Sequence, residues 1–591
     1  MMRPRQFGPR IEPDGGVTFR LWAPAARSVA LLTNRVTPMR RDDQGWYEVT
    51  LRDAKAGTRY RFRIDGELDV PDPASSFQPD DVSGPGEVID HEFSWLADTW
   101  RGRPWHEAAT LEIHIGTFTP EGTFLAAIDK LSHVVTTGFT AIELMPVADF
   151  SGRWNWGYDG VLPFAPDSTY GRPEDLKALI DAAHARGLMV FLDVVYNHFG
   201  PEGNYLGRYA PEFFDPESRT PWGAAIDYDV PEVRAFAIEN ALHWLDTYRF
   251  DGLRLDAIHS ISKRGAPPIL ENLSRAVGAL AIETDRTIHL ILENDANTAS
   301  LLDPRTDPPR GRYRAQWNDD YHHAWHVLLT GETSGYYRDF SETPRAQLAR
   351  ILSTGFAYQG EPSPHRGDEP RGEPSGYLPS TAFVSFLQNH DQIGNRPRGE
   401  RIASLAPQRA IEAALAVMLL APMPPLMFMG EEWGSVQPFP FFCDFEGDLA
   451  EAVREGRRQE FREAYASQQE QGSIPDPLDE ATFQEAKLKW FHRDQSPYDG
   501  RLEYVERLLK LRREHIIPRM ANLGDRHNRA TRVGDAISVQ WQLNGGTLSL
   551  VANLSDKVTR CPLVSPTRPI WGGEPEDTLA PWAVHWGWRG G

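Results

Sequence analysis

From about residue 105 onward, short apolar runs typical of buried strands alternate with stretches whose apolar residues recur with a helical period. One helix is predicted over 173–186, because Pro173 suits a helix start and Gly187 suits a helix end. Alternating strands and helices over this length predict an α/β fold, a (β/α)8 TIM barrel. The sixth strand has the weakest pattern. The strands are predicted at 111–118, 139–147, 189–196, 250–257, 288–294, near 312–318, and at 383–389 and 425–430.

The two ends of the chain have a different pattern. Residues 17–22 and 60–65 alternate apolar and polar side chains, and Pro/Asp-rich turn signals follow at 71–86. Residues 536–541 and 547–553 also read as strands. We therefore expect a β-domain over 1–98, a catalytic barrel over 99–521 and a C-terminal β-sandwich over 522–591. Within the barrel we expect a loop lobe at 199–230 and a helical extension at 450–515.

Polar side chains gather where four of the predicted barrel strands end. These segments are Asp193–His198, Gly252–His259, Ile291–Asp295 and Phe386–Asp391. Each places carboxylate, imidazole or guanidinium groups after an apolar run. Because the carboxyl ends of barrel strands meet at one mouth, the four segments predict a single acid–base site there.

Composition narrows the class of partner. The formal net charge is −21, and a surface this acidic disfavours both nucleic acid and anionic membranes as partners. Cys443 and Cys561 are the only cysteines, so neither a disulfide framework nor a zinc-finger pattern is expected. The first residues lack the apolar core of a signal peptide, which predicts a cytoplasmic protein.

In order and spacing, the four strand-end segments resemble the four sequence regions of the α-amylase superfamily of retaining glycoside hydrolases (family 13). The resemblance implies the barrel fold and an immunoglobulin-like N-terminal module like that of branching and debranching members. It also implies three catalytic carboxylates. Asp256 would be the nucleophile, Glu293 the general acid and base, and Asp391 the carboxylate that holds sugar hydroxyls.

The spacing of Arg254 and Asp256 carries its own argument. Residues i and i+2 of a strand share a face, so the guanidinium of Arg254 should lie beside the carboxylate of Asp256. A positive neighbour favours the ionised carboxylate that a nucleophile needs. His390 and Asp391 should face the same site, and a uniform strand would separate them, so regular pleating must end by Asn389.

The resemblance also implies substrate contacts. Tyr158 matches a tyrosine that stacks on the sugar at the cleavage point, and His198 and His390 match two histidines that bind the same ring. Arg254 belongs to the same set. His259 ends the second strand-end segment and Gln392 directly follows the fourth, and both are expected to contact substrate.

Longer segments resemble one subgroup of this family, the members that cut the α-1,4 bond next to a terminal trehalose and release trehalose. The resemblance implies maltooligosyltrehalose and related α-glucans as substrates, and a maltooligosyltrehalose synthase as the pathway partner. The segments are Trp154–Gly160, Arg219–Asp227, Ala315–His323, Thr330–Tyr337 and Phe428–Trp433.

A trehalose leaving group is bent at its linkage and needs its own pocket. We expect segment 315–323 to be a loop that forms the wall of this pocket, with Trp317 as a stacking surface and Asn318 and Asp319 as polar contacts. No cofactor is expected. Calcium is not expected either, because segment 199–230 lacks a cluster of acidic ligands for an ion beside Asn197.

Two alternatives stay open. A glycogen branching or debranching enzyme would share the N-terminal module and the three carboxylates, although Asp159 stands where branching enzymes usually have glutamine. A non-catalytic glucan-binding barrel is disfavoured because all three carboxylates are present.

Overall fold

The computed structural model describes residues 5–220, 222–261, 266–303, 313–462, 474–521, 528–561 and 567–591. Within them, eight parallel strands form one sheet in the order β22-β19-β18-β17-β14-β11-β10-β23. A parallel bridge between Ser385 and Pro425 joins the two outer strands, which closes the barrel. The strands are β10 (Thr110–Ile113), β11 (Ala141–Leu144), β14 (Met189–Val194), β17 (Gly252–Leu255), β18 (His289–Leu292), β19 (Ala315–Trp317), β22 (Phe383–Val384) and β23 (Leu426–Phe428).

The predicted barrel is therefore confirmed, with its sixth strand at 315–317; residue 312 lies outside the described residues. The strands form because their sequences are almost continuously apolar, as parallel strands covered on both faces require. All six residues of β14 are buried. Parallel register aligns the strand ends: Asp193 on β14 lies opposite Arg254 on β17. Polar groups that follow the strands thus meet at one mouth of the barrel.

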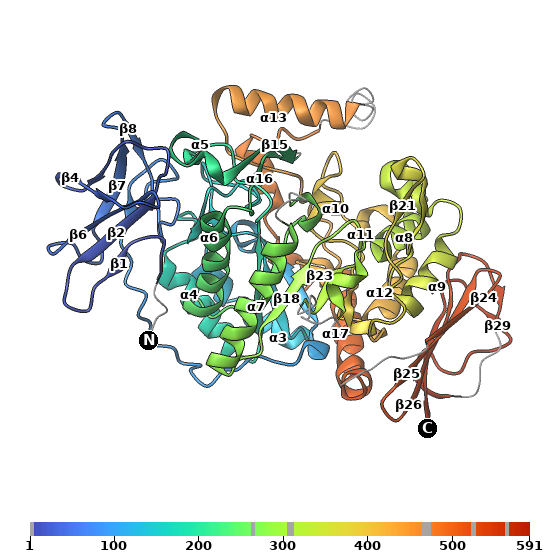
Figure 1. The fold of residues 1–591 in the computed structure, drawn as a ribbon. Coiled ribbons are helices and arrows are strands. Elements are labelled where there is room, and N and C mark those ends of the chain that lie inside the picture. The colour runs from blue at the N-terminus through green and yellow to red at the C-terminus, as the bar shows by residue number, and fades with distance from the viewer. Residues whose placement is uncertain are drawn as a thin grey trace.

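Helices cover the outside of the barrel (Figure 1). Helix α4 begins as predicted at Pro173, with the Asp175 side chain accepting a hydrogen bond from the Arg172 backbone, but it ends at His184. A turn then runs to Gly187, whose φ of 78° favours glycine. The main helices are α2 (Phe124–Ile128), α3 (Leu131–Thr137), α4 (Pro173–His184), α6 (Pro231–Leu242), α7 (Ala266–Thr284), α8 (Asp319–Thr330), α9 (Pro344–Thr354), α12 (Gln408–Leu420) and α17 (Tyr498–Leu511).

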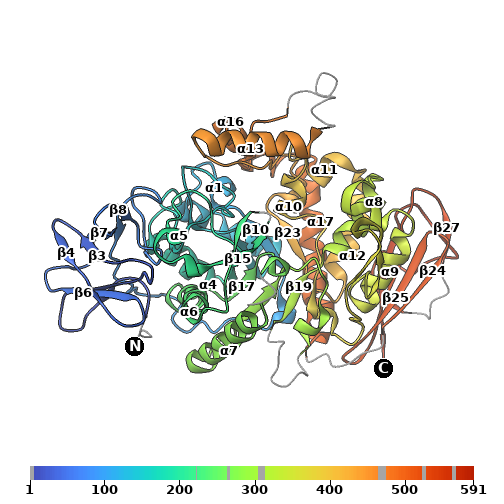
Figure 2. The same cartoon turned by 45° about the horizontal axis from the view of Figure 1, so that its top comes forward.

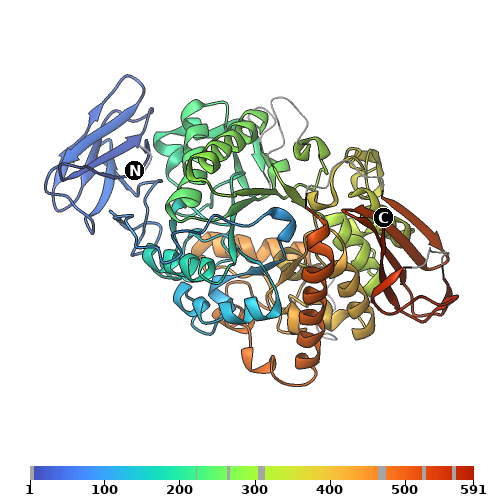
Figure 3. The ribbon, with the colours of Figure 1, turned by 90° about the horizontal axis from the view of Figure 1, so that it is seen from below.

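The N-terminal β-domain and the C-terminal β-domain lie at opposite sides of the barrel (Figure 3). The first has two facing sheets, β1-β2-β6-β5 and β4-β3-β7-β8, and the second has a five-stranded sheet, β24-β25-β26-β30-β28, with a small sheet β27-β29. The N-terminal strands are β1 (Arg10–Ile11), β2 (Val17–Trp22), β3 (Val29–Leu32), β4 (Val36–Pro38), β5 (Arg40–Arg41), β6 (Trp46–Leu51), β7 (Arg59–Ile64), β8 (Leu68–Val70) and β9 (Gly86–Glu87). The C-terminal strands are β24 (Arg529–Val533), β25 (Ala536–Leu543), β26 (Gly546–Asn553), β27 (Thr559–Arg560), β28 (Arg568–Trp571), β29 (Thr578–Leu579) and β30 (Val584–Gly590).

These domains confirm the predicted fold class. The boundary expected at residue 98 stays a prediction, and the one at 522 lies outside the described residues. Among the described residues, none of the helices is both long and apolar enough to cross a membrane.

Segment 199–230 folds into the short helix α5 (Leu206–Tyr209) and a two-stranded hairpin, β15 (Phe214–Thr220) and β16 (Gly223–Ile226). Further along the chain, α13 (Gly447–Glu460) and α16 (Glu480–Ala486) lie over the same side of the barrel as α5 (Figures 1 and 2). Both segments are insertions that rise above the barrel rather than parts of its wall.

Candidate active site

Arg254 and Asp256 meet at the end of β17, as their spacing predicts. The Arg254 Nη1 atom donates to Asp256 Oδ1 at 2.8 Å and to both oxygens of Asp193, at 2.9 and 2.7 Å. Its guanidinium lies 4.2 Å from the centre of the Trp317 ring. The Asn197 amide donates to Asp256 Oδ2 at 2.9 Å, so both carboxylate oxygens of Asp256 are held.

Glu293 follows the neighbouring strand β18 and turns toward the same guanidinium. Its Oε2 atom lies 3.7 Å from Arg254 Nη2 and accepts a 2.5 Å hydrogen bond from the backbone N–H of Ala257. Ala257 has a left-handed φ of 41°, so the chain turns sharply directly after the N–H that donates to Glu293. Burial raises the pKa of Glu293 well above its ordinary value, against the opposing charge of Arg254, and Asp256 and Asp319 raise it further.

The two carboxyl groups are therefore unlike. Asp256 accepts hydrogen bonds from a cation and an amide, whereas burial favours the protonated form of Glu293. Adjacent strands lie about 4.8 Å apart, and a retaining glycosidase places its two carboxyl groups about 5 Å apart. This pair can supply one nucleophile and one acid on neighbouring strand ends.

Helix α10 (His390–Gly394) carries the third carboxylate. Strand β22 stops at Val384, so regular pleating ends by Asn389, as predicted; Asn389 caps this helix, and its side chain accepts from the backbone N–H of Asp391. Asp391 is exposed, and its Oδ1 accepts a 2.7 Å hydrogen bond from Asn395. Gln392 Oε1 accepts from the backbone of Asn389, so that oxygen completes the cap and is not free for sugar.

Gly394 lets helix α10 approach the barrel. A Cβ atom at this position would lie 1.8 Å from the Trp156 ring, which is far inside a van der Waals contact. Trp156 is buried and stacks on Phe439 with ring centres 5.4 Å apart. The position of Asp391 thus depends on a glycine that no strand-end pattern indicates.

Tyr158 and the two histidines lie together beside Asp193. The Tyr158 and His390 rings stack with centres 5.1 Å apart, and the Tyr158 hydroxyl donates to Asp193 Oδ2 at 2.6 Å. His198 Nε2 lies 3.0 Å from the Tyr158 carbonyl, and Trp222 stacks on the His198 ring with centres 5.4 Å apart. Trp222 is 51% exposed and offers an open aromatic face next to these groups.

The predicted pocket wall differs most from the structure. Segment 315–323 is strand β19 and the start of α8, not a loop. Trp317 is 1% exposed and lies against Arg254, so it offers no free face for stacking on sugar. Asn318 is fully buried, and its amide donates to the Gly355 carbonyl at 2.9 Å. The predicted sugar contacts of Trp317 and Asn318 are therefore wrong.

Asp319 does reach the site. Burial raises its pKa to about 7, helped by the charges of Asp295 and Asp391 and opposed by Arg371. His259 lies exposed at the same rim, where its Nδ1 accepts from the Asp295 backbone at 3.4 Å. Asp319 is thus a second carboxyl group, beside Glu293, that can be protonated near neutral pH.

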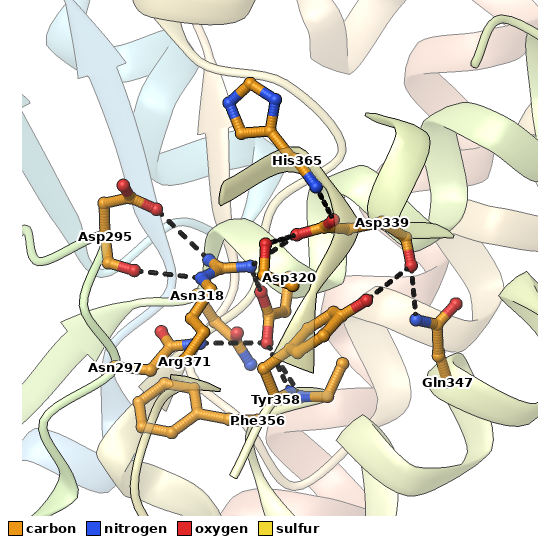
Figure 4. A network of polar contacts seen from close by, with 12 residues as sticks. Asp295, Asn297, Asn318, Asp320, Asp339, Gln347, Phe356, Tyr358, His365 and Arg371 are labelled. Carbon is orange, nitrogen blue, oxygen red and sulfur yellow. Dashed lines mark hydrogen bonds and ion pairs between the residues drawn. The ribbon is translucent and has the colours of Figure 1, made fainter. Parts of the chain in front are cut away.

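A polar network at the start of helix α8 connects Arg371 to three other segments of the chain (Figure 4). The buried Arg371 pairs with Asp295 at 3.2 Å, with Asp320 at 2.9 Å and with Asp339 at 4.0 Å. Its hairpin, β20 (Glu361–Ser363) and β21 (Glu369–Arg371), is thereby fixed against the start of α8. The mouth of the barrel has a rigid wall on this side.

Sequence reasoning missed two side chains near the site, Trp222 and Glu112. Glu112 is a carboxylate inside the apolar strand β10, and its side chain contacts His390. A charged residue in the middle of an apolar strand is an informative signal, because such residues are rarely buried unless they are paired. Among the described residues, no group of three or more His, Cys, Asp or Glu side chains is arranged to hold a metal ion.

Comparison with known families covers all three domains. Residues 81–219 match the α-amylase catalytic domain, and residues 6–76 match carbohydrate-binding module 48, the isoamylase N-terminal domain. Residues 522–586 match a domain of unknown function, DUF3459.

Close relatives extend over almost the whole chain. The chain is 40% identical to malto-oligosyltrehalose trehalohydrolase of Saccharolobus solfataricus, over 86% of this chain and 87% of that one. It is 41% identical to the Deinococcus radiodurans enzyme of the same name, over 92% and 88%. A crystal structure described as a putative α-amylase from Salmonella typhimurium superposes with a TM-score of 0.94, at 44% identity, covering 99% of this chain and all of that one. This chain belongs to the malto-oligosyltrehalose trehalohydrolase family, within the α-amylase family of glycoside hydrolases.

Proposed function

We propose that this protein is a retaining glycoside hydrolase that cleaves the α-1,4-glucosidic bond next to the terminal trehalose of maltooligosyltrehalose and releases trehalose. One observation carries the chemistry: a single guanidinium, Arg254, contacts both an ionisable nucleophile and a carboxyl group that burial keeps protonated. The nearly full-length relatives named for this reaction support the substrate.

In this mechanism Asp256 attacks the anomeric carbon while Glu293 gives its proton to the departing glycosidic oxygen. A covalent β-glucosyl-enzyme forms on Asp256, and trehalose leaves. Glu293, now ionised, removes a proton from water, which attacks the same carbon and frees Asp256. Arg254 and Asn197 orient the nucleophile, and Asp391 binds sugar hydroxyls at the open side of the site.

The leaving-group side would supply the preference for trehalose. We assign Asp319 as its polar contact, with His259 at the rim and the hairpin that carries Arg371 as the fixed wall. A carboxyl group that can be protonated near neutral pH can either donate to or accept from sugar hydroxyls. A rigid wall favours one bent disaccharide over a flexible glucan end, because little ordering is needed on binding.

Product analysis tests the proposed function. The protein is incubated separately with maltotriosyltrehalose, maltopentaose and a branched glucan, and the products are separated by anion-exchange chromatography. Trehalose as the main product, with little cleavage of maltopentaose, is the expected result. Comparable cleavage of maltopentaose would reject the trehalose specificity, and action on branch points alone would favour the branching or debranching alternative.

A variant tests the assignment of Asp319. In Asp319→Ala the ratio of kcat/KM for maltotriosyltrehalose to that for maltopentaose should fall. The matched control is Asp448→Ala, which also removes a carboxylate from the first turn of a helix but lies on the exposed helix α13. An unchanged ratio in Asp319→Ala would remove this residue from the pocket.

The trehalose cap must itself be made by another enzyme. We propose a maltooligosyltrehalose synthase as the pathway partner, because hydrolysis of the bond next to a terminal trehalose does not itself form that trehalose unit.

A further inference from the structure

Glu112 is a carboxylate sealed inside the barrel, on strand β10, with a side chain only 2% exposed. Its Oε1 atom lies 2.5 Å from His390 Nδ1, and its Oε2 atom accepts from the backbone N–H of His390 at 3.2 Å. One carboxylate therefore binds both the ring and the main chain of the first residue of helix α10. It joins the first barrel strand to the helix that carries Asp391.

The hydrogen bonds that run from Asp193 through Tyr158 to His390 determine which atoms carry the protons. The Tyr158 hydroxyl has a single proton, which it donates to Asp193 Oδ2. Asp193 also accepts from Arg254 through both oxygens, so it acts as an ionised acceptor. The Tyr158 oxygen, 2.8 Å from His390 Nε2, must then accept a hydrogen bond from an N–H at that nitrogen.

The other ring nitrogen is also a donor. His390 Nδ1 faces a carboxylate oxygen of Glu112, and a carboxylate only accepts. Both nitrogens of His390 therefore carry hydrogen, which makes the ring an imidazolium. The negative charge of Glu112 balances it inside the barrel.

Charged and titratable groups face His390 from every element packed against it. Glu112 on β10 and Asp391 on its own helix favour the cation, and Arg254 on β17 opposes it. His114, just after β10, also lies within electrostatic range, and Tyr158 contacts Nε2. Burial alone lowers the pKa of a histidine, yet the pKa of His390 is raised, with Glu112 as the main opposing cause.

We propose that Glu112 is a positioning residue that holds His390 as a fixed imidazolium, whose Nε2–H donates to the Tyr158 hydroxyl and so holds the Tyr158 ring beside Asp193 for the sugar bound at Asp256. Glu112 itself touches no substrate and acts only through His390. The inference rests on the proposed function for the identity of the sugar.

The neighbouring strand supplies a matched control. Glu143 on β11 lies at the register position opposite Glu112 and is also buried. Within the described residues its Oε1 has no hydrogen-bond partner, and burial, with the charges of Asp193 and Glu112, raises its pKa well above the ordinary value. Burial therefore favours the neutral form of Glu143, and Glu143→Gln keeps the size of the side chain while removing its titration.

The test compares the full-length wild type with Glu112→Gln and Glu143→Gln. The first measurement is the NMR titration of the His390 ring in ¹⁵N-histidine-labelled protein, assigned with His390→Asn. It requires no activity, so it stays interpretable if the proposed function fails. The second is the pH dependence of kcat and KM on whichever α-1,4-glucoside the wild type cleaves.

In the wild type, His390 should titrate above the ordinary range of a histidine. In Glu112→Gln it should titrate lower, the alkaline limb of kcat should move to lower pH, and kcat at pH 8 should fall about 10²-fold. The loss should be smaller at pH 5, where the ring regains its proton. Glu143→Gln should match the wild type in both measurements.

Either of two results would overturn the proposal. One is a wild-type His390 that titrates at or below its ordinary range, which stays decisive even if Glu112→Gln does not fold. The other is a Glu112→Gln protein that folds and loses kcat equally at all pH values with an unmoved His390 titration, since Glu112 would then be merely structural.

Discussion

Replacing Arg254 with methionine is expected to destabilise the barrel as well as abolish activity. Methionine keeps a long apolar side chain against Trp317 but removes the charge. Arg254 is 3% exposed and is the cation between Asp193, Asp256 and the more distant Glu293. Without it, the buried carboxylate of Asp193 and the half-buried carboxylate of Asp256 are neighbouring negative charges with no cation between them.

The magnitude follows from burial. Removing one partner of a buried ion pair costs about 3–5 kcal/mol, because an uncompensated charge stays in the interior. With an unfolding entropy of about 2.1 cal/mol/K per residue, a barrel of roughly 400 residues loses about 1.2 °C of Tm per kcal/mol. Arg254→Met should therefore lower Tm by about 4–6 °C at pH 8.

The loss of Tm in Arg254→Met should become smaller as the pH falls. Burial already raises the pKa of Asp193 to about 6 with Arg254 present, and removing the cation raises it further. A group whose folded pKa is raised binds its proton more tightly when folded, so the penalty appears as pH rises from the ordinary aspartate pKa through the folded one. At pH 5 the carboxyl group is protonated, and most of the penalty is absent.

Differential scanning calorimetry at pH 5 and pH 8 checks this. The control is Arg275→Met, which breaks an i,i+4 pair with Glu271 at 3.0 Å on helix α7, where the Arg275 side chain is 63% exposed. Such surface pairs contribute about 0.3–0.5 kcal/mol, so Tm should change by less than about 1 °C. Equal shifts in the two variants, or a shift for Arg254→Met that does not depend on pH, would refute the reasoning.

Three further predictions concern groups in and around the site. In Glu293→Gln, kcat should fall about 10²–10⁴-fold while calorimetry shows unchanged binding of the intact substrate; undiminished turnover would exclude Glu293 as the acid. Asp149 is buried, both of its carboxyl oxygens lack a hydrogen-bond partner among the described residues, and burial raises its pKa well above the ordinary value. Asp149→Asn should therefore gain Tm over the wild type as pH rises from 5 to 8, and a constant difference would contradict the assignment. In Gly394→Ala the new methyl group would displace Trp156 and helix α10, so kcat should fall about 10²-fold. The control is Gly456→Ala on α13, where nothing lies within 4 Å of the new methyl group; it should stabilise its helix by about 1 kcal/mol and leave kcat unchanged. Equal changes of kcat in the two glycine variants would contradict the role of Gly394.

Strand positions and strand-end chemistry could be predicted because both are local in sequence. The strand expected at 250–257 lies at Gly252–Leu255, and that expected at 189–196 lies at Met189–Val194. The pairing of Arg254 with Asp256 follows from two residues of one strand. Apolar continuity and a period of two are properties of neighbouring residues, so they can be recognised without knowledge of the fold.

Contacts between distant segments could not be predicted in this way. Glu112 and His390 are 278 residues apart, and nothing in either segment indicates the other. Trp317 and Asn318 are expected in a loop because the sixth strand has the weakest pattern, yet Trp317 ends strand β19 and helix α8 begins directly after Asn318, with both residues buried. Their burial depends on Arg254 and Gly355, which come from other parts of the barrel.

In the proposed function, the chemistry and the recognition of the leaving group lie on different segments. Arg254 gives two neighbouring carboxyl groups different surroundings, because it donates to Asp256 at 2.8 Å but lies 3.7 Å from Glu293, whose pKa burial raises. These groups stand on the ends of the fourth and fifth strands, which pack in the barrel itself. Asp319 and the hairpin of Arg371 belong to segments that follow the sixth strand, and their contacts with one another hold them in place. We therefore expect substitutions in that wall to alter which leaving group is accepted while the contacts of Asp256 with Arg254 and Asn197 are kept. Asp319 is the exception, because its charge also raises the pKa of Glu293.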